Sequence, residues 1–357
     1  MLHRVLFITI CTILIMTSNF AQQKKAFING NIYTVNEKQP KVEAVLIEGG
    51  RIVSVGTNDD IRKKIDQNTK IIDLQGKFMM PGFNDAHLHF LSGGFYLMGI
   101  DLRPARSINQ FRAILSDYIK KYPGKWVTGG RWDHENWDIK NLPTKADIDD
   151  ITEGTPVFVS RMDGHSGLAN SKALELAGIN KDTPSPEGGL ILKDPATGEP
   201  TGILKDNAMI LMFNVIPDHD ADDFYQAALT ALKEAASYGI TSVQDIFSVE
   251  EIPAYEAYKR LESEGKLTCR ISIRWPVEDY KFLISNKMKS GTGNDFLSIE
   301  AIKAYSDGSL GSSSAWFFEP YEGDNGNTGL PNDIVLNGKL KLWAADADKN
   351  GIQVSTH

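Results

Sequence analysis

Two histidines stand two residues apart in the apolar stretch PGFNDAHLHF, residues 81–90. Side chains alternate faces along a β-strand, so His87 and His89 would point the same way if this stretch is a strand. Imidazole is a common metal ligand, and two converging nitrogens supply half of a tetrahedral zinc site. Asp85 on the same face favours this hypothesis. The alternative is a pair of ordinary polar residues on a half-buried strand.

Two more residues could do metal chemistry near the ends of later expected strands. An ordinary lysine, such as Lys303, is protonated at neutral pH and is a poor ligand. A buried lysine with a lowered pKa can be neutral and take up carbon dioxide, and the two oxygens of the carbamate could bridge two metal ions. The alternative for Lys303 is a solvated or ion-paired lysine. His357 would offer a third imidazole.

The elements that must position these residues alternate between helix and strand from residue 222 onward. Apolar residues at helical spacing stop at Gly239, and a strand over residues 240–246 follows at once. Helical stretches separate it from further expected strands over residues 268–275, 298–305 and 352–357. This rhythm is typical of parallel βαβ units, whose active groups lie at the carboxyl ends of the strands.

The region before the histidine pair follows a different pattern, with short apolar runs and tight turns. The dipeptides Asn29-Gly30 and Gly49-Gly50 each separate two such runs, and both tolerate the positive φ that two-residue hairpin turns require. We expect a small β domain with a hairpin at each dipeptide. The next run, residues 77–90, is more continuous and hydrophobic, which is typical of a strand covered on both faces.

A long irregular region separates this strand from the later ones. It begins with a helix that Ser107 and Gln110 would open as a capping box. Short strands over residues 126–128 and 157–160 follow, and then a helix over residues 171–177 that Asn170 can cap. Several stretches in it are rich in turn-forming residues.

Composition limits the class of protein. The chain has 357 residues, with 41% hydrophobic and 24% charged, so it is long enough for one large barrel or two ordinary domains. The net charge of -8 predicts no basic patch, and nucleic acid is not an expected partner.

Residues 1–21 have the plan of a secretory signal peptide, with Arg4 before an uncharged apolar run. An uncleaved anchor is the alternative. Cleavage would remove Cys11 and leave Cys269 as the one cysteine of the mature chain, so no intrachain disulfide is expected. We expect an exported protein, periplasmic or secreted, without stable membrane association after cleavage.

Several motifs, taken in order, resemble the amidohydrolase superfamily. PGFNDAHLHF is similar to the first barrel strand of that superfamily, and GRIVSVG (residues 50–56) to a turn of its N-terminal β domain. Four further motifs narrow the resemblance to the YtcJ-like, amidohydrolase-3 branch over residues 26–357: DGHSGLANSKALELAGI, GGLILKDPATGEPTGIL, GITSVQD and IKAYSDGSLGS. Their order and number carry the resemblance, because each piece alone is weak.

The resemblance implies an α/β fold, an incomplete metal-dependent (β/α)8 TIM-like barrel with a small N-terminal β-sandwich and a large insertion after barrel strand 1. The implied organisation is a signal peptide over residues 1–21, the N-terminal part of the sandwich over 22–76, and barrel strands 1 to 5 over 77–357 with an insertion at about 104–217. A terminal edge strand at 352–357 is the alternative to truncation.

The resemblance also implies a site. His87, His89 and His357 would bind one or two divalent metal ions, with zinc the expected ion, and Lys303 would be a carboxylated bridging ligand. The sixth-strand histidine and the eighth-strand aspartate of the family have no counterpart here. Since that aspartate would be the general acid and base, we expect this chain to be inactive alone.

Substrate contacts are expected from four residues, each with an alternative. Asp163 and His165 would line the pocket or form a structural turn. Trp132 would belong to a cap over the site or take part in exposed packing of the insertion. Arg274 would bind a substrate carboxylate or pair with a local acid.

The leading hypothesis is an exported amidohydrolase that cleaves a non-peptide C–N bond of a small molecule. A deaminase or cyclic-imide hydrolase would use the same scaffold and ligands. An exported solute-binding protein is the alternative outside catalysis. The oligomeric state stays open, a homodimer included.

Overall fold

The computed structural model describes residues 24–247, 251–310, 313–323 and 326–357. It forms two compact units that divide in sequence between Gly82 and Phe83. The expected signal peptide lies outside the described residues. In the described ranges, no helix combines the length and the apolar character needed to cross a membrane.

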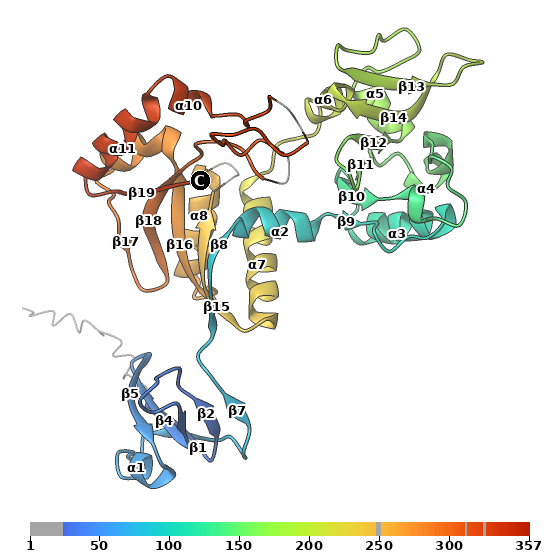
Figure 1. Cartoon of the computed structure of the whole chain (residues 1–357). Helices are drawn as coiled ribbons and strands as arrows, with labels where there is room; N and C mark the ends of the chain where they lie inside the picture. Colours follow the sequence, from blue (N-terminus) through green and yellow to red (C-terminus); the bar gives the residue numbers. More distant parts are fainter. Residues whose placement is uncertain (1–23, 248–250, 311–312, 324–325) are drawn as a thin grey trace, which may run out of the picture. The chain divides into compact units, whose positions relative to one another are not determined.

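The first unit consists of two small sheets and one short helix (Figure 1). One sheet has the order β5-β4-β1-β6 and the other the order β3-β2-β7. Apolar side chains from both sheets share one buried cluster around Ile32, Val42 and Val45. The bounds are β1 Lys25–Ile28, β2 Asn31–Tyr33, β3 Lys41–Val42, β4 Ala44–Glu48, β5 Arg51–Gly56, α1 Asn58–Arg62, β6 Lys70–Asp73 and β7 Phe78–Met79.

Of the two hairpins expected in this unit, one is confirmed. Gly49 and Gly50, with φ of 58° and 77°, join the antiparallel strands β4 and β5. The prediction of a hairpin at Asn29-Gly30 is wrong, because β1 pairs with β4 and β6 while β2 pairs with β3 and β7. Asn29 does adopt a positive φ of 55°, but its turn carries the chain from one sheet to the other.

The second unit contains a six-stranded sheet of order β13-β14-β12-β11-β10-β9 with its own buried clusters. Its elements cover most of the expected insertion. They are β9 Ile100–Asp101, α3 Ile108–Lys121, β10 Gly129–Trp132, α4 Asp149–Thr152, β11 Phe158–Arg161, β12 Ser166–Ala169, α5 Ser171–Leu176, β13 Gly189–Lys193, β14 Pro200–Asp206 and α6 Ile210–Phe213, with short 3-10 turns at His134–Asn136, Lys145–Asp147 and Asn207–Met209.

Two helix caps in this sheet region were expected from the sequence. Ser107 accepts a hydrogen bond from Gln110 N and begins α3, while the Gln110 side chain accepts from Arg106 N, so the expected capping box is half formed. Asn170 caps α5 as predicted, accepting from Ala173 N. The strand expected at residues 126–128 is wrong, because there only Val127 forms a bridge and the strand begins at Gly129.

The remaining elements form a curled sheet of five parallel strands in the order β8, β15, β16, β18, β19, with the short β17 antiparallel to β18. This is an incomplete TIM-like barrel, as predicted. The strands are β8 Phe83–Leu88, β15 Ile240–Ile246, β16 Arg270–Pro276, β17 Thr292–Gly293, β18 Leu297–Ala304 and β19 Gln353–Thr356. The helices are α2 Phe90–Met98, α7 Ala221–Ser237, α8 Glu251–Ser263, α9 Tyr280–Ser285, α10 Asp333–Leu336 and α11 Lys339–Lys349, with a 3-10 turn at Val277–Asp279.

Helices pack on one face of this parallel sheet. In β16, Ile271, Ile273 and Trp275 are buried against helices α7, α8 and α9, in the largest apolar cluster of the described chain. The residues between them, Ser272 and Arg274, therefore point to the opposite, concave face. That face is where a barrel keeps its inward side chains.

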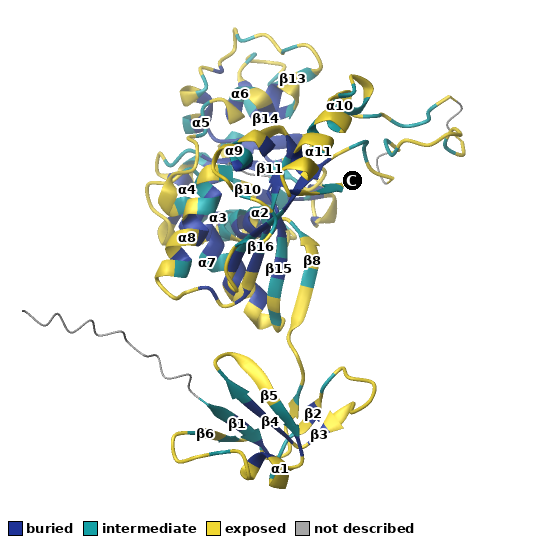
Figure 2. Ribbon diagram, turned by 90° about the vertical axis from the view of Figure 1, so that its left-hand side faces the viewer, coloured by how far each residue is buried: buried dark blue, intermediate teal, exposed yellow. Residues whose placement is uncertain are grey.

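The first strand of this sheet departs from the prediction. We expected it to be covered on both faces, yet most of β8 is exposed and Phe83 is 57% exposed. Figure 2 shows β8 largely exposed beside the darker β15 and β16. The cause is its edge position, since β8 pairs only with β15 among the described strands. The continuous run of residues 77–90 is also broken, with β7 belonging to the first unit.

Candidate metal centre

Four side chains from four neighbouring strands share the concave face of the parallel sheet. Leu88 packs against the helices, so His87 before it points the other way. The same alternation places Gln244 of β15 and Arg274 of β16 on that face. Lys303 of β18 lies between Ile302 and Ala304, which both pack in the helix-side cluster. Parallel pairing in this strand order brings the four together at the carboxyl ends.

The electrostatics of His87 reflect the positive groups that lie around it. Partial desolvation lowers the pKa of the His87 imidazole although the residue is exposed, and the positive groups of Lys303, His89, Arg274 and His357 lower it further. His87 therefore favours its neutral form, which is the form that binds a metal.

His89 lies just beyond the strand, as the residue that caps α2, with φ of -97° and ψ of 79°. Simple strand alternation therefore does not place its ring. The ring is held instead by a hydrogen bond of 2.9 Å between Nδ1 and the carbonyl oxygen of Ile246. A carbonyl oxygen can only accept, so Nδ1 carries a proton, and in the neutral ring Nε2 is the nitrogen with a lone pair for a ligand.

A buried carboxylate lies directly behind His89. Asp245 is 1% exposed, and its Oδ1 accepts a hydrogen bond of 2.7 Å from the backbone N–H of Phe90. Its Oδ2 accepts from the hydroxyl of Tyr258 at 2.7 Å, and Tyr258 is fully buried in α8. Burial raises the pKa of the Asp245 carboxyl to about 6, although both hydrogen bonds favour its charged form.

Lys303 is 5% exposed, so the solvated alternative does not describe it. Burial lowers the pKa of its amine, and the nearby Arg274 lowers it further. In the described ranges no carboxylate is paired with it, and its Nζ lies 5.3 Å from the centre of the Tyr305 ring. A buried amine with a lowered pKa and no acidic partner has the properties that carbamate formation requires.

His357 lies at the end of β19 and contributes to the electrostatics of His87. Its Nε2 is 3.0 Å from the carbonyl oxygen of Gly308, so that nitrogen is engaged with the loop after β18. Arg274, predicted to bind a substrate carboxylate or pair with a local acid, donates to the Oε1 of Gln244, and its contact with substrate stays a prediction.

The donor set fits part of a metal site. His87 and His89 can offer two imidazole nitrogens to a divalent ion when both rings are neutral. In the parts of the chain that the structure describes, however, no group of three or more His, Cys, Asp and Glu side chains could hold a metal ion. A further ligand would have to come from Lys303, as a carbamate, or from a different position of His357.

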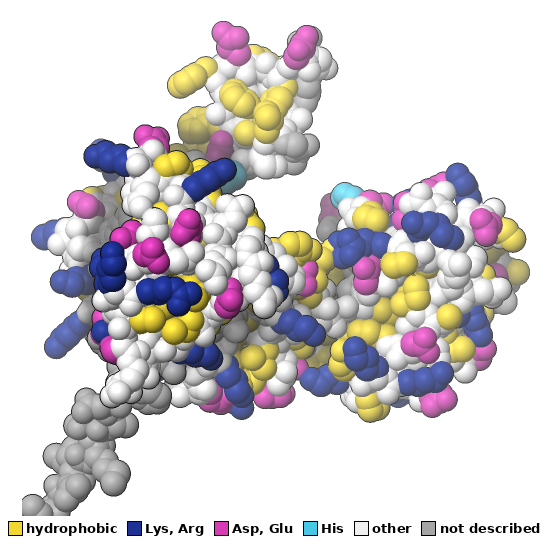
Figure 3. Space-filling view, turned by 90° about the horizontal axis from the view of Figure 1, so that it is seen from below, with side chains coloured by type: hydrophobic (Ala, Val, Ile, Leu, Met, Phe, Trp, Pro, Cys, Tyr) yellow, Lys and Arg dark blue, Asp and Glu magenta, His cyan; other side chains and the backbone are white. Residues whose placement is uncertain are grey.

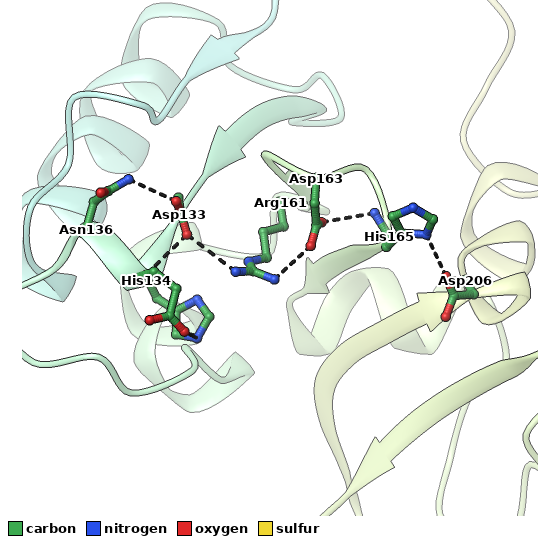
Figure 4. Close-up of polar contacts among 8 residues, drawn as sticks. Asp133, His134, Asn136, Arg161, Asp163, His165 and Asp206 are labelled. Atoms are coloured by element: carbon green, nitrogen blue, oxygen red, sulfur yellow. Dashed lines mark hydrogen bonds and ion pairs between the residues drawn. The ribbon is translucent and has the colours of Figure 1, made fainter. Parts of the chain in front are cut away.

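Asp163 and His165, which were predicted to line the pocket, belong to a series of polar contacts in the six-stranded sheet region (Figure 4). Arg161 binds Asp163 at 2.7 Å and Asp133 at 3.5 Å. His165 donates its backbone N–H to Asp163 and places Nδ1 2.8 Å from Asp206. The Asp-Gly turn of the alternative is thus present. Both predicted side chains are also open to solvent, and substrate contact stays a prediction.

Trp132 is fully buried in the core of the same region, and its indole N–H donates to the carbonyl of Val159 at 2.9 Å. Its ring packs near Phe111 and Trp137. The ring therefore packs in the core of the insertion. It is buried where the alternative expected exposed packing, and we leave Trp132 out of the proposed pocket.

The comparison with protein families identifies the chain. The model of the amidohydrolase family matches residues 70–357. The chain belongs to the amidohydrolase family. Within it, YtcJ of Bacillus subtilis (strain 168) is 30% identical over 94% of this chain, which agrees with the predicted YtcJ-like branch.

Other relatives of this amidohydrolase are similarly distant. Protein LONG AFTER FAR-RED 3 of Arabidopsis thaliana is 34% identical over 92% of the chain, and the N-substituted formamide deformylase of Arthrobacter pascens is 30% identical over 67%. The crystal structure of a metal-dependent hydrolase from Pyrococcus horikoshii has 30% identity and a TM-score of 0.74, and the match covers 94% of this chain and 65% of that one. The chain spans 58% of the Arabidopsis protein, 63% of YtcJ and 45% of the deformylase.

The sequence motifs did not indicate a role for Asp245, Tyr258 or Gln244, which the structure places beside the candidate site. One signal was present for Asp245, an acidic residue near the end of an apolar strand motif, GITSVQD. Nothing local to Tyr258 distinguishes it from the core aromatics of an amphipathic helix.

Proposed function

We propose that this amidohydrolase is an exported enzyme that cleaves a non-peptide C–N bond, as in an amide, an N-acyl amine or a formamide, with a divalent metal ion. The observation that carries the proposal is the pair His87 and His89, with a lowered pKa at His87 and with Nδ1 of His89 held by the Ile246 carbonyl, beside the buried Lys303. The deformylase relative supports formamides as one candidate substrate class.

A bound divalent ion would polarise the scissile carbonyl and lower the pKa of a bound water to about 7. The protein groups would prepare that site. His87 and His89 would each donate a lone pair from a neutral imidazole. The neutral amine of Lys303 would form an N–C bond with carbon dioxide and release one proton, giving a carbamate with two ligand oxygens. Zinc is the ion we propose, since nitrogen and oxygen donors in this number suit it.

Proton transfer to the leaving nitrogen needs a general acid and base. The aspartate that the family resemblance assigns to this role has no counterpart in the 357 residues. We therefore propose that the purified chain binds metal without releasing amine from an amide or formamide. Release of amine by the chain alone, abolished by a chelator, would contradict this part of the proposal.

The charge distribution fits a small-molecule enzyme. On the face shown in Figure 3, Lys and Arg side chains are interspersed with Asp and Glu. With a net charge of -8, this supports a small substrate as partner over nucleic acid.

A thermal shift tests metal binding quickly. Zinc that binds only the folded protein should raise its stability by about 2.7 kcal/mol at a hundredfold excess over Kd. We expect the shift in wild type, its reversal by a chelator, and its loss in the His87→Ala/His89→Ala variant. An equal shift in that variant would show that zinc binds elsewhere.

A further inference from the structure

We propose that Asp245 is a positioning residue for the His89 ligand: its carboxylate holds the backbone at the start of α2, so that His89 keeps Nδ1 on Ile246 and presents Nε2 to the metal. The inference rests on the proposed function for the metal, but the arrangement of His89 is a property of the chain itself.

Two adjacent hydrogen bonds connect the end of β15 to the segment that carries His89. The ring of His89 binds the carbonyl of Ile246 at 2.9 Å. The next residue, Phe90, donates its N–H to Asp245 at 2.7 Å. The neighbours His89 and Phe90 thus bind the neighbours Ile246 and Asp245. A rotation of the backbone at position 89 would break both hydrogen bonds together.

The carboxylate is itself immobilised. Its second oxygen accepts from Tyr258 at 2.7 Å, and both side chains are almost completely buried, at 1% and 0% exposed. A carboxylate held through both oxygens cannot turn without leaving a buried donor unpaired, which costs about 1–3 kcal/mol. The Asp245–Tyr258 pair therefore fixes the position of the Phe90 N–H rather than following it.

The chain offers no local substitute for this contact. His89 occupies the cap position of α2, and its side chain makes no capping hydrogen bond. The first N–H groups of a helix need acceptors from outside the helix, and Asp245 supplies one from a different strand. Asp245 can reach the N–H of Phe90 because it lies opposite Leu88 in the β8–β15 register.

The test compares an isosteric with an apolar replacement. Asp245→Asn keeps an oxygen for Phe90 N–H, and its amide can donate to the Tyr258 oxygen. Asp245→Leu has the same branched shape, with methyl groups in place of the oxygens, and cannot accept. The matched control is Asn170→Leu, which removes another buried side-chain cap, 1% exposed, from α5 in the other sheet region.

Two measurements are made on each folded variant. The first is the ring tautomer of His89 in the metal-free protein, from long-range ¹H–¹⁵N spectra. The second is zinc affinity, from competition with a chromophoric chelator. We expect wild type, Asp245→Asn and Asn170→Leu to keep the Nδ1–H tautomer and to agree in affinity within about threefold, and Asp245→Leu to show mixed tautomers and about 10–100-fold weaker binding.

An unchanged His89 tautomer in Asp245→Leu would overturn the inference, as would unchanged zinc affinity. Equal losses in Asn170→Leu would also overturn it, because they would show a general effect of lower stability. If wild type binds no zinc, the proposed function fails, while the tautomer comparison still decides the role of Asp245. If Asp245→Leu does not fold, Tyr258→Phe replaces it. That variant should populate the second tautomer and weaken zinc binding several-fold, and no change in it would overturn the inference.

Discussion

The backbone carbonyl of Ala227 on α7 occupies the space that a side chain on Gly94 of α2 would need. A Cβ built on Gly94 would lie far inside van der Waals contact with the Ala227 oxygen. The two helices thus approach backbone to backbone. Since α2 begins directly after His89, this contact fixes the helix next to the second histidine.

We predict that Gly94→Ala destabilises the protein, by roughly 1–3 kcal/mol, because the clash is with backbone that cannot move alone. Thermal or urea unfolding measures the change. The neighbouring Gly93 is the matched control, since a Cβ there meets nothing within 4 Å. Gly93→Ala should be stabilising by roughly 0.5–1 kcal/mol, as expected for alanine inside a helix. Equal effects of the two substitutions would show that the helix approach is not tight.

Cys269 should be unreactive in the folded protein. It is 2% exposed, and burial raises the pKa of its thiol to about 11 from 9.0. The thiolate is the reactive species, so a disulfide reagent at pH 8 should label Cys269 only after unfolding. Rapid labelling under native conditions would show that the strand end at Cys269 opens readily.

The same shift makes stability depend on pH. Between pH 9 and 11 the unfolded chain loses the thiol proton and the folded chain keeps it. The contribution of the thiol to the free energy of unfolding is therefore complete below pH 9 and is lost as pH rises through 11. Two pKa units correspond to a loss of about 3 kcal/mol. Because lysines and tyrosines titrate there too, the measurement is the difference in unfolding free energy between wild type and Cys269→Ala across this range. A constant difference would contradict the shift.

Lys303 should take up carbon dioxide. Its amine is buried, has a lowered pKa and has no acidic partner among the described residues. With ¹³C-bicarbonate and zinc, we expect a carbamate signal by ¹³C NMR that is absent from Lys303→Arg, since the guanidinium stays protonated. An exposed lysine replaced in the same way, Lys281→Arg, should leave the signal intact. The same signal in Lys303→Arg would assign the carbamate to another lysine.

The sequence predicted the order of the barrel strands well because each carries its own local pattern. Alternation of helix and strand, with Gly239 and Gly265 ending helices at positive φ, indicates parallel units without knowledge of long-range contacts. It did not predict which strands pair at Asn29-Gly30, because a turn dipeptide permits a reversal without choosing the partner strand.

The sequence predicted the parts of the candidate site that depend on residue type. It did not predict the parts that depend on contacts between residues distant in sequence. His87, His89 and Lys303 could be recognised as residue types at strand ends. The hydrogen bond from Phe90 to Asp245 joins residues 155 positions apart, and no local pattern indicates it. The edge exposure of β8 was also missed, because an apolar run does not show whether a neighbouring strand covers it.

Metal content tests the central proposal most directly. Purified protein, stripped with a chelator and then dialysed against zinc, is analysed by atomic emission beside His87→Ala/His89→Ala. A control that removes two exposed imidazoles from outside the parallel strands, His165→Ala/His219→Ala, is treated in the same way. We predict about one to two equivalents of zinc in wild type and in the control, and loss of the metal in His87→Ala/His89→Ala. A folded wild type that retains no metal, or equal metal in all three proteins, would contradict a metal centre at His87 and His89.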